Sequence, residues 1–121
     1  MIQIHTYDSY EDLSKHAAQL VSDQIRMKPD SVLGLATGSS PVGLYKELIR
    51  MHQEEDLDFA NVTSFNLDEY LGLNPEHAQS YRTFMNQNLF DHINIEIVRT
   101  HVPSGIAEDI AAMALAYEQA I

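Results

Sequence analysis

Val32-Leu-Gly-Leu-Ala-Thr-Gly-Ser-Ser-Pro41 is the stretch of sequence that decides the fold. Its apolar part predicts a buried strand over 31–36. The small polar residues 37–40 predict a loop, and Pro41 is favoured at the first position of a helix. A buried strand that passes through a short loop into a helix is the repeating unit of α/β proteins.

The loop over 37–40 has the chemistry of an anion site. The first amide N–H groups of a helix have no partner within the helix, and the helix dipole adds partial positive charge there. Thr37, Ser39 and Ser40 add hydroxyl donors, and Gly38 lets the backbone approach a ligand closely. These four residues are therefore predicted to bind a small-molecule sugar phosphate, although a capped turn without a ligand would have a similar composition.

Strand-like and helix-like segments alternate along the chain. The strands are expected over 2–6, 31–36, 61–67 and 96–102. The helices are expected to start after Asp8 or Ser9, at Pro41, after Ser80 and near Ile106, and the last of them to reach Ile121. Four alternations predict a mostly parallel α/β sheet in layers, with the Met and Tyr stripe of the last helix in the core.

The charge balance is strongly acidic, with 18 Asp and Glu against 7 Lys and Arg and a formal charge of -11. Such a chain repels nucleic acid and anionic membrane, so we expect neither as a partner. The chain has no cysteine for disulfides, and we see no secretion signal or membrane span, which predicts a cytoplasmic protein. Its six histidines are scattered and are not expected to bind a metal.

Few cations accompany the predicted anion loop. Lys46 and Arg50 are nearest in sequence, and only Arg82 and Arg99 follow. Because phosphate sites usually add Arg or Lys, we expect further cations from outside 1–121. The last helix also lacks the strand that normally follows it in a βαβ unit. We expect 1–121 to be a single α/β domain that is the N-terminal part of a longer one; a domain that simply ends in a helix is the alternative.

A second polar motif, Phe65-Asn-Leu-Asp-Glu-Tyr70, follows the expected strand 61–67. Open α/β sheets bind ligands at the carboxyl edge, so Asp68 and the loop 37–40 are expected to face one crevice. A carboxylate beside an anchored sugar phosphate can act as general base at a carbon next to a carbonyl or imine. Taken alone, an Asp after a strand is more often a turn former.

Glu69, Tyr70 and Tyr81 are candidate supporting residues. The charge of Glu69 adjoins Asp68, and the two tyrosines have rings that could close over a sugar. Aromatic side chains are more often part of the core, which is the alternative for both tyrosines.

Three segments together resemble the glucosamine-6-phosphate deaminase family: Gly34-Leu-Ala-Thr-Gly-Ser-Ser-Pro41, Phe65-Asn-Leu-Asp-Glu-Tyr-Leu-Gly-Leu73 and Ser80-Tyr-Arg-Thr-Phe-Met85. Their order and spacing match, and the likeness covers essentially the whole chain. The first segment alone also resembles sugar-phosphate isomerases and 6-phosphogluconolactonases. Tyr70 after the acidic pair favours the deaminase, because the lactonases usually have Arg there.

The resemblance implies a Rossmann-like αβα fold and a cofactor-free reaction that converts glucosamine 6-phosphate to fructose 6-phosphate and ammonia. Asp68 would take the proton from C2, and Ser39 and Ser40 would lie near the phosphate. Family members are about twice as long, and their second half carries the ring-opening His and the phosphate-binding cations. We therefore expect little deaminase activity from 1–121 alone. The family includes monomers and larger assemblies, which leaves a homo-oligomer open. A lactonase or isomerase of the same fold, or a non-catalytic phosphosugar-binding module, are the alternatives.

Overall fold

Three parallel strands form the centre of the computed structural model, which describes all residues 1–121. They are β1 (Val32–Leu35), β2 (Thr63–Asn66) and β3 (Thr100–His101), in the order β1-β2-β3. Leu35 pairs with Asn66, so β1 and β2 end side by side. The alternating sequence therefore gives the parallel α/β architecture that it predicts.

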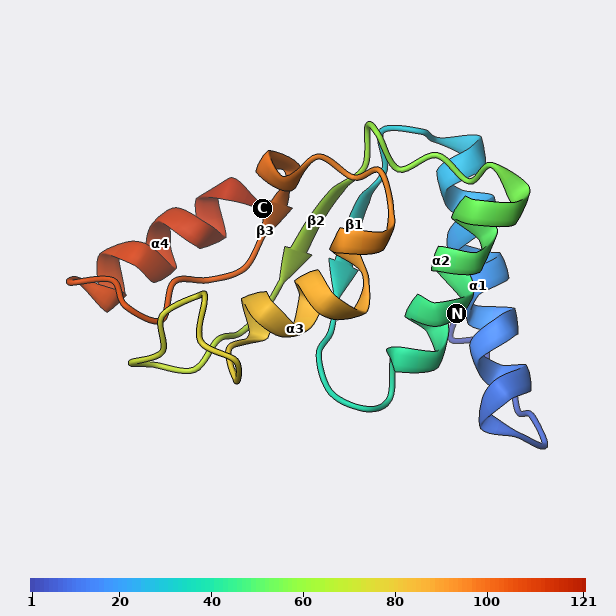
Figure 1. Ribbon diagram of the computed structural model, residues 1–121, viewed down its shortest axis with the longest axis horizontal. Coiled ribbons are helices and arrows are strands. Elements are labelled where there is room, and N and C mark those ends of the chain that lie inside the picture. Colours follow the sequence, from blue (N-terminus) through green and yellow to red (C-terminus); the bar gives the residue numbers. More distant parts are fainter.

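Four α-helices and two short 3-10 turns surround these strands. The helices are α1 (Tyr10–Met27), α2 (Val42–Glu55), α3 (Tyr81–Asn88) and α4 (Ile110–Ala120), and the 3-10 turns are η1 (Phe90–His92) and η2 (Ile97–Arg99). In Figure 1, α1 and α2 lie together beyond β1, and α4 lies at the opposite end of the molecule beyond β3.

Local capping explains where two of the helices begin. The Ser9 side chain accepts the N–H of Asp12, and that of Ser80 accepts the N–H of Thr83, which confirms both serines as N-caps. Pro41 precedes α2 as its N-cap instead of occupying the first helical position.

The buried core lies between the sheet and the helices α1, α2 and α3. Its largest fully buried side chains are Tyr45, Phe59, Leu48, Leu57, Met85 and Leu89. None of the four helices has the length and the continuous apolar character needed to cross a lipid bilayer.

The expected strand over 2–6 is not formed. Ile2 and Ile4 are 90% and 84% exposed, and neither belongs to the sheet. A strand needs a neighbour to pair its backbone groups, and no segment of 1–121 pairs with this one. The prediction of a strand over 2–6 is therefore wrong for this structure, because the alternating apolar pattern alone does not supply a pairing partner.

The last expected strand is much shorter than 96–102. Residues Ile97–Arg99 form a 3-10 turn, which leaves only Thr100–His101 in β3. The Thr100 hydroxyl donates to the Ile97 carbonyl at 2.6 Å and thereby holds the turn.

The last helix begins at Ile110, later than expected, and none of its residues is buried. Leu115 is 61% exposed, whereas Tyr117 packs edge-to-face on Phe65 of β2. The expectation that the whole Met and Tyr stripe is core is therefore wrong, because this helix covers only part of one sheet face.

Candidate functional site

The buried side chain of Tyr45 holds the backbone of Ala36, the residue between β1 and the loop over 37–40. The Ala36 N–H donates to the Tyr45 hydroxyl at 3.1 Å, and that hydroxyl donates to the Ala36 carbonyl. Tyr45 lies on α2 and is 1% exposed, and burial raises its pKa to about 12. One side chain thus satisfies both backbone groups at the root of the loop.

The free amides of this site belong to the loop more than to the helix. The Val42 N–H donates to the Ser39 carbonyl at 3.4 Å, and the Gly43 N–H donates to the Tyr10 hydroxyl at 2.8 Å. The N–H groups of 37–40 donate to no other group of the protein. The first two amides of α2 thus have partners within the protein, whereas those of the loop, in which Gly38 has a φ of 94°, do not; which amides bind an anion stays a prediction.

Asp68 lies at the same edge of the sheet as this loop. The pairing of Leu35 with Asn66 places the residues after both strands side by side, and the Asn66 side-chain amide donates to the Leu35 carbonyl at 3.0 Å. The shared edge that the sequence predicts is thus present. Asp68 itself is exposed.

Glu69 does not act as a second free charge beside Asp68. Its carboxylate accepts the N–H groups of Tyr81 at 2.8 Å and of Arg82 at 3.1 Å. It therefore caps α3 from a position 12 residues before Tyr81 and ties the segment after β2 to that helix.

Tyr70 and Tyr81 contact one another beside the loop, with ring centroids 4.6 Å apart. The pKa of Tyr81 is raised, first by its hydrogen bond with Tyr70, then by burial and by the charges of Tyr70 and Asp68, while a hydrogen bond with Thr37 opposes the shift. The phenol of Tyr81 therefore lies among groups from both predicted motifs.

Separate cavities adjoin the Tyr70–Tyr81 pair and Asp68. One, of about 280 Å³, is lined by Gly38, Tyr70 and Tyr81. The other, of about 300 Å³, is lined by Asp68, Pro103 and Tyr117, so it lies between the end of β2 and α4. Gly38 and Asp68 thus line different cavities, with the Tyr70–Tyr81 pair beside the first.

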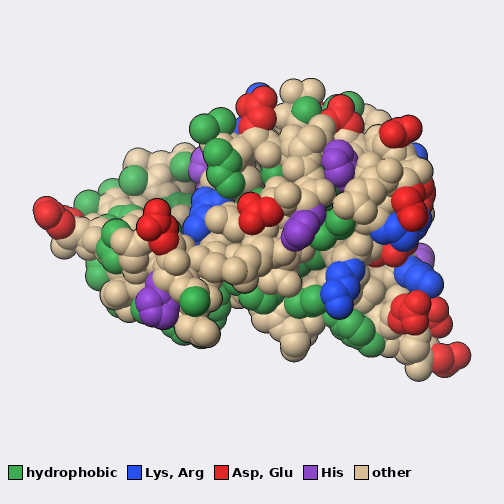
Figure 2. Space-filling model, viewed as in Figure 1, with side chains coloured by type: hydrophobic (Ala, Val, Ile, Leu, Met, Phe, Trp, Pro, Cys, Tyr) green, Lys and Arg blue, Asp and Glu red, His purple; other side chains and the backbone are tan.

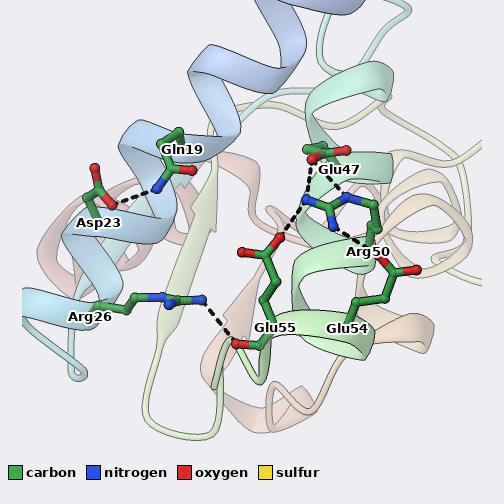
Figure 3. Close-up of polar contacts among 7 residues, drawn as sticks. All are labelled: Gln19, Asp23, Arg26, Glu47, Arg50, Glu54 and Glu55. Carbon is green, nitrogen blue, oxygen red and sulfur yellow. Dashed lines mark hydrogen bonds and ion pairs between the residues drawn. The ribbon is translucent and has the colours of Figure 1, made fainter.

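Lysine and arginine line neither cavity. Arg50 is held by Glu47, Glu54 and Glu55 at 2.6 to 2.9 Å, and Arg26 donates to the Glu55 carbonyl (Figure 3). Over α1 and α2, Figure 2 shows the Lys and Arg side chains close to acidic ones. Arg26 and Arg50 are therefore engaged away from the site, and the expectation that further cations come from outside 1–121 stays a prediction.

Arg82 is likewise committed within the fold. Its guanidinium donates to the Thr100 hydroxyl at 2.8 Å and to the Thr100 carbonyl at 3.0 Å, and burial lowers its pKa. Arg82 thereby ties α3 to β3 and is not directed at the loop 37–40.

Known proteins resemble this chain in sequence and in fold. The sequence model of the family described as glucosamine-6-phosphate isomerases/6-phosphogluconolactonase matches residues 6–121. The chain belongs to this family. The match covers nearly the whole length of the chain.

The similar relatives within the family are deaminases. The chain is 54% identical to a glucosamine-6-phosphate deaminase of Thermoanaerobacter sp. (strain X514), over 93% of this chain and 45% of that protein. It is 57% identical to the deaminase of Clostridium perfringens (strain SM101 / Type A), over 93% of this chain and 47% of that protein. The chain thus spans about half the length of the curated relatives that it matches.

Solved structures agree on the fold. A monomeric glucosamine-6-phosphate deaminase superimposes with a TM-score of 0.96 at 45% identity, covering 98% of this chain and 49% of that one. A 6-phosphogluconolactonase from Thermotoga maritima gives a TM-score of 0.71 at 20% identity, covering 94% of this chain and 50% of that one, which shows the fold alone.

Two residues of the site region escape sequence reasoning. Tyr45 has the helical spacing of the apolar residues Leu48 and Met51, and the only available signal is that a buried phenol needs a polar partner. Tyr10 reaches the loop from α1 across 29 residues of sequence, which no local pattern reveals.

Proposed function

We propose that this chain supplies the base and the anion loop of a glucosamine-6-phosphate deaminase. The proposal is supported by the family match and by the deaminases that share more than half of its aligned residues. The observation that carries it is the adjacency of the loop 37–40 and Asp68 at the ends of the paired strands β1 and β2.

In this proposal, Thr37, Gly38, Ser39 and Ser40 line the substrate site, with Ser39 and Ser40 near the phosphate. The Asp68 carboxylate removes the proton from C2, the proton is returned at C1, and an enolamine forms between them. Protonation at C1 leaves an imine at C2, and water hydrolyses its C=N bond to the ketone of fructose 6-phosphate with release of ammonia. No cofactor enters this balance, because no net oxidation occurs.

Supporting roles fall to the residues around Asp68. Glu69 holds the segment after β2 on α3, and Tyr70 and Tyr81 form an aromatic wall for the sugar. The ring-opening acid and the phosphate-binding cations are assigned to the part of the relatives' length that this chain does not span.

We further propose that residues 1–121 are the N-terminal part of a longer domain that works in the cytoplasm on a small molecule. The similar solved structure is described as monomeric, and the proposed site draws on one copy of the chain. A homo-oligomer would be detected by light scattering at micromolar concentration.

The test is ammonia release from glucosamine 6-phosphate, measured for the longest polypeptide containing this chain that its gene encodes and for residues 1–121 alone. The longest form is expected to turn over, and 1–121 alone to show little or no activity. A parallel assay with 6-phosphogluconolactone identifies a lactonase instead. Turnover of the lactone without ammonia release overturns the proposal, as does phosphosugar binding without either reaction.

A further inference from the structure

We propose that Tyr10 is a positioning residue that sets the direction of the phosphate-binding amides in the loop 37–40. This inference rests on the proposed function. Tyr10 is the first residue of α1, yet its hydroxyl lies at the junction between the loop and α2.

A single hydroxyl joins both sides of that junction. It accepts the Gly43 N–H at 2.8 Å, and its proton is shared between the carbonyls of Ser39 and Ser40, each at 2.9 Å. The Ser39 and Ser40 carbonyls are therefore directed toward α1. Gly43 cannot offer its N–H to a ligand at the same time.

The geometry of the peptide bond converts this contact into an orientation. In a trans peptide, the C=O of one residue and the N–H of the next point in opposite directions. Since the Ser39 carbonyl points at Tyr10, the Ser40 N–H points away from α1, and no group of the protein accepts it. Tyr10 thus presents the Ser40 N–H to a ligand.

The packing of the two helices gives independent support. A Cβ added at Gly43 would lie 2.4 Å from the Ser14 hydroxyl oxygen and 2.9 Å from the Cε1 atom of Tyr10. Only glycine allows α2 to approach α1 this closely, and this approach brings the Tyr10 hydroxyl within reach of the junction.

The test compares Tyr10→Phe with Tyr7→Phe in the longest encoded form of the protein. Tyr10→Phe removes only the hydroxyl, whereas the hydroxyl of Tyr7 makes no hydrogen bond and its ring only packs on His16. We expect Tyr10→Phe to raise KM for glucosamine 6-phosphate and the inhibition constant of inorganic phosphate together, by about two- to tenfold for one lost hydrogen-bonding group. The kcat of Tyr10→Phe is expected to change by less than about twofold, because the lost contact affects binding of the phosphate and not the proton transfer. The control variant Tyr7→Phe is expected to match the wild type in all three constants.

Two outcomes overturn the inference. One is an unchanged phosphate inhibition constant in Tyr10→Phe. The other is an equal fall of kcat and kcat/KM without a change in KM, which would indicate a general loss of active protein. If the wild type releases no ammonia, the proposed function has failed. The role of Tyr10 is then still decided by titrating wild type and Tyr10→Phe with inorganic phosphate and following the NMR shifts of the amides of 37–40.

Discussion

The carboxylate of Glu69 accepts the backbone N–H of Tyr81 at 2.8 Å and thereby joins the segment after β2 to the first turn of α3. A charged acceptor at a helix N-terminus satisfies an amide that has no partner in the helix and interacts favourably with the helix dipole. Glu69 is therefore part of the framework that holds Asp68 in place.

Replacing Glu69 by Gln keeps the shape of the side chain but removes its charge. We expect a loss of about 1 kcal/mol in the free energy of unfolding, because a neutral acceptor binds helix-terminal amides less strongly. Urea denaturation followed by circular dichroism measures this loss. Glu76→Gln is the matched control, since Glu76 is exposed in the same connection and makes no side-chain hydrogen bond. Equal effects in both variants would contradict the capping role.

Replacing Tyr45 by Phe leaves the N–H and C=O groups of Ala36 without their partner. Ala36 is exposed, so water can reach these groups, and the free energy of unfolding is expected to fall by about 0.5–1.5 kcal/mol at neutral pH. Differential scanning calorimetry beside Tyr7→Phe checks the expectation. A wild-type melting temperature in Tyr45→Phe would show that Ala36 finds other partners.

The pH dependence of stability gives a second test at Tyr45. Its pKa is raised from 10.0 to about 12 by burial. The native state therefore binds more protons than the unfolded state between those values, so stability falls as pH rises through this window. Denaturation of the wild type between pH 10 and 12 should show this fall, at roughly 1.4 kcal/mol for each pH unit at most. Tyr45→Phe should have a flatter profile, and parallel profiles would refute the assignment.

Substitution of Asp68 by Asn should separate chemistry from folding. Because Asp68 is exposed, the free energy of unfolding is expected to stay within about 0.5 kcal/mol of the wild type. Loss of a general base should lower kcat for ammonia release by about 10²- to 10⁴-fold. Asp91→Asn, another exposed carboxylate, is the control for the change of charge. Substantial residual turnover in Asp68→Asn would mean that another group takes the C2 proton.

Gly105 and Gly34 offer a matched pair of glycines. A Cβ at Gly105 would lie 2.1 Å from the Tyr70 carbonyl oxygen, whereas a Cβ at Gly34 meets nothing within 4 Å. The Gly105 carbonyl also accepts the Gly72 N–H at 2.7 Å. Gly105→Ala should therefore displace the segment that carries Tyr70 and destabilise the fold by about 1–3 kcal/mol. Gly34→Ala should be nearly neutral; comparable melting temperatures for the two variants would contradict the close packing.

The sequence predicts the architecture well wherever the signal is local. The strand and loop over 31–40 and the N-caps Ser9 and Ser80 depend on residues a few positions apart, and the structure contains all of them. The expectation that this strand is buried is wrong, because β1 lies at the edge of the sheet and Val32 is 59% exposed. The expected strand over 2–6 is absent, because a strand also requires a partner that no local pattern supplies.

The candidate site divides in the same way. The order of strand and loop in each motif predicts that Asp68 and the loop 37–40 share one sheet edge, since parallel neighbours end on the same side. Which amides stay free depends on Tyr10, and how the Asp68 segment is held depends on the contact of Glu69 with α3.

The sequence by itself determined the alternation of strands and helices, the helix starts at serine caps and the chemistry available in the two motifs. Only the tertiary structure decided that Tyr10 and Tyr45 fix the loop and that Glu69 caps a helix. The physical reason is range: propensity and periodicity act between near neighbours in the chain, whereas Tyr10 and Gly43 are 33 residues apart and meet only because α1 packs on α2.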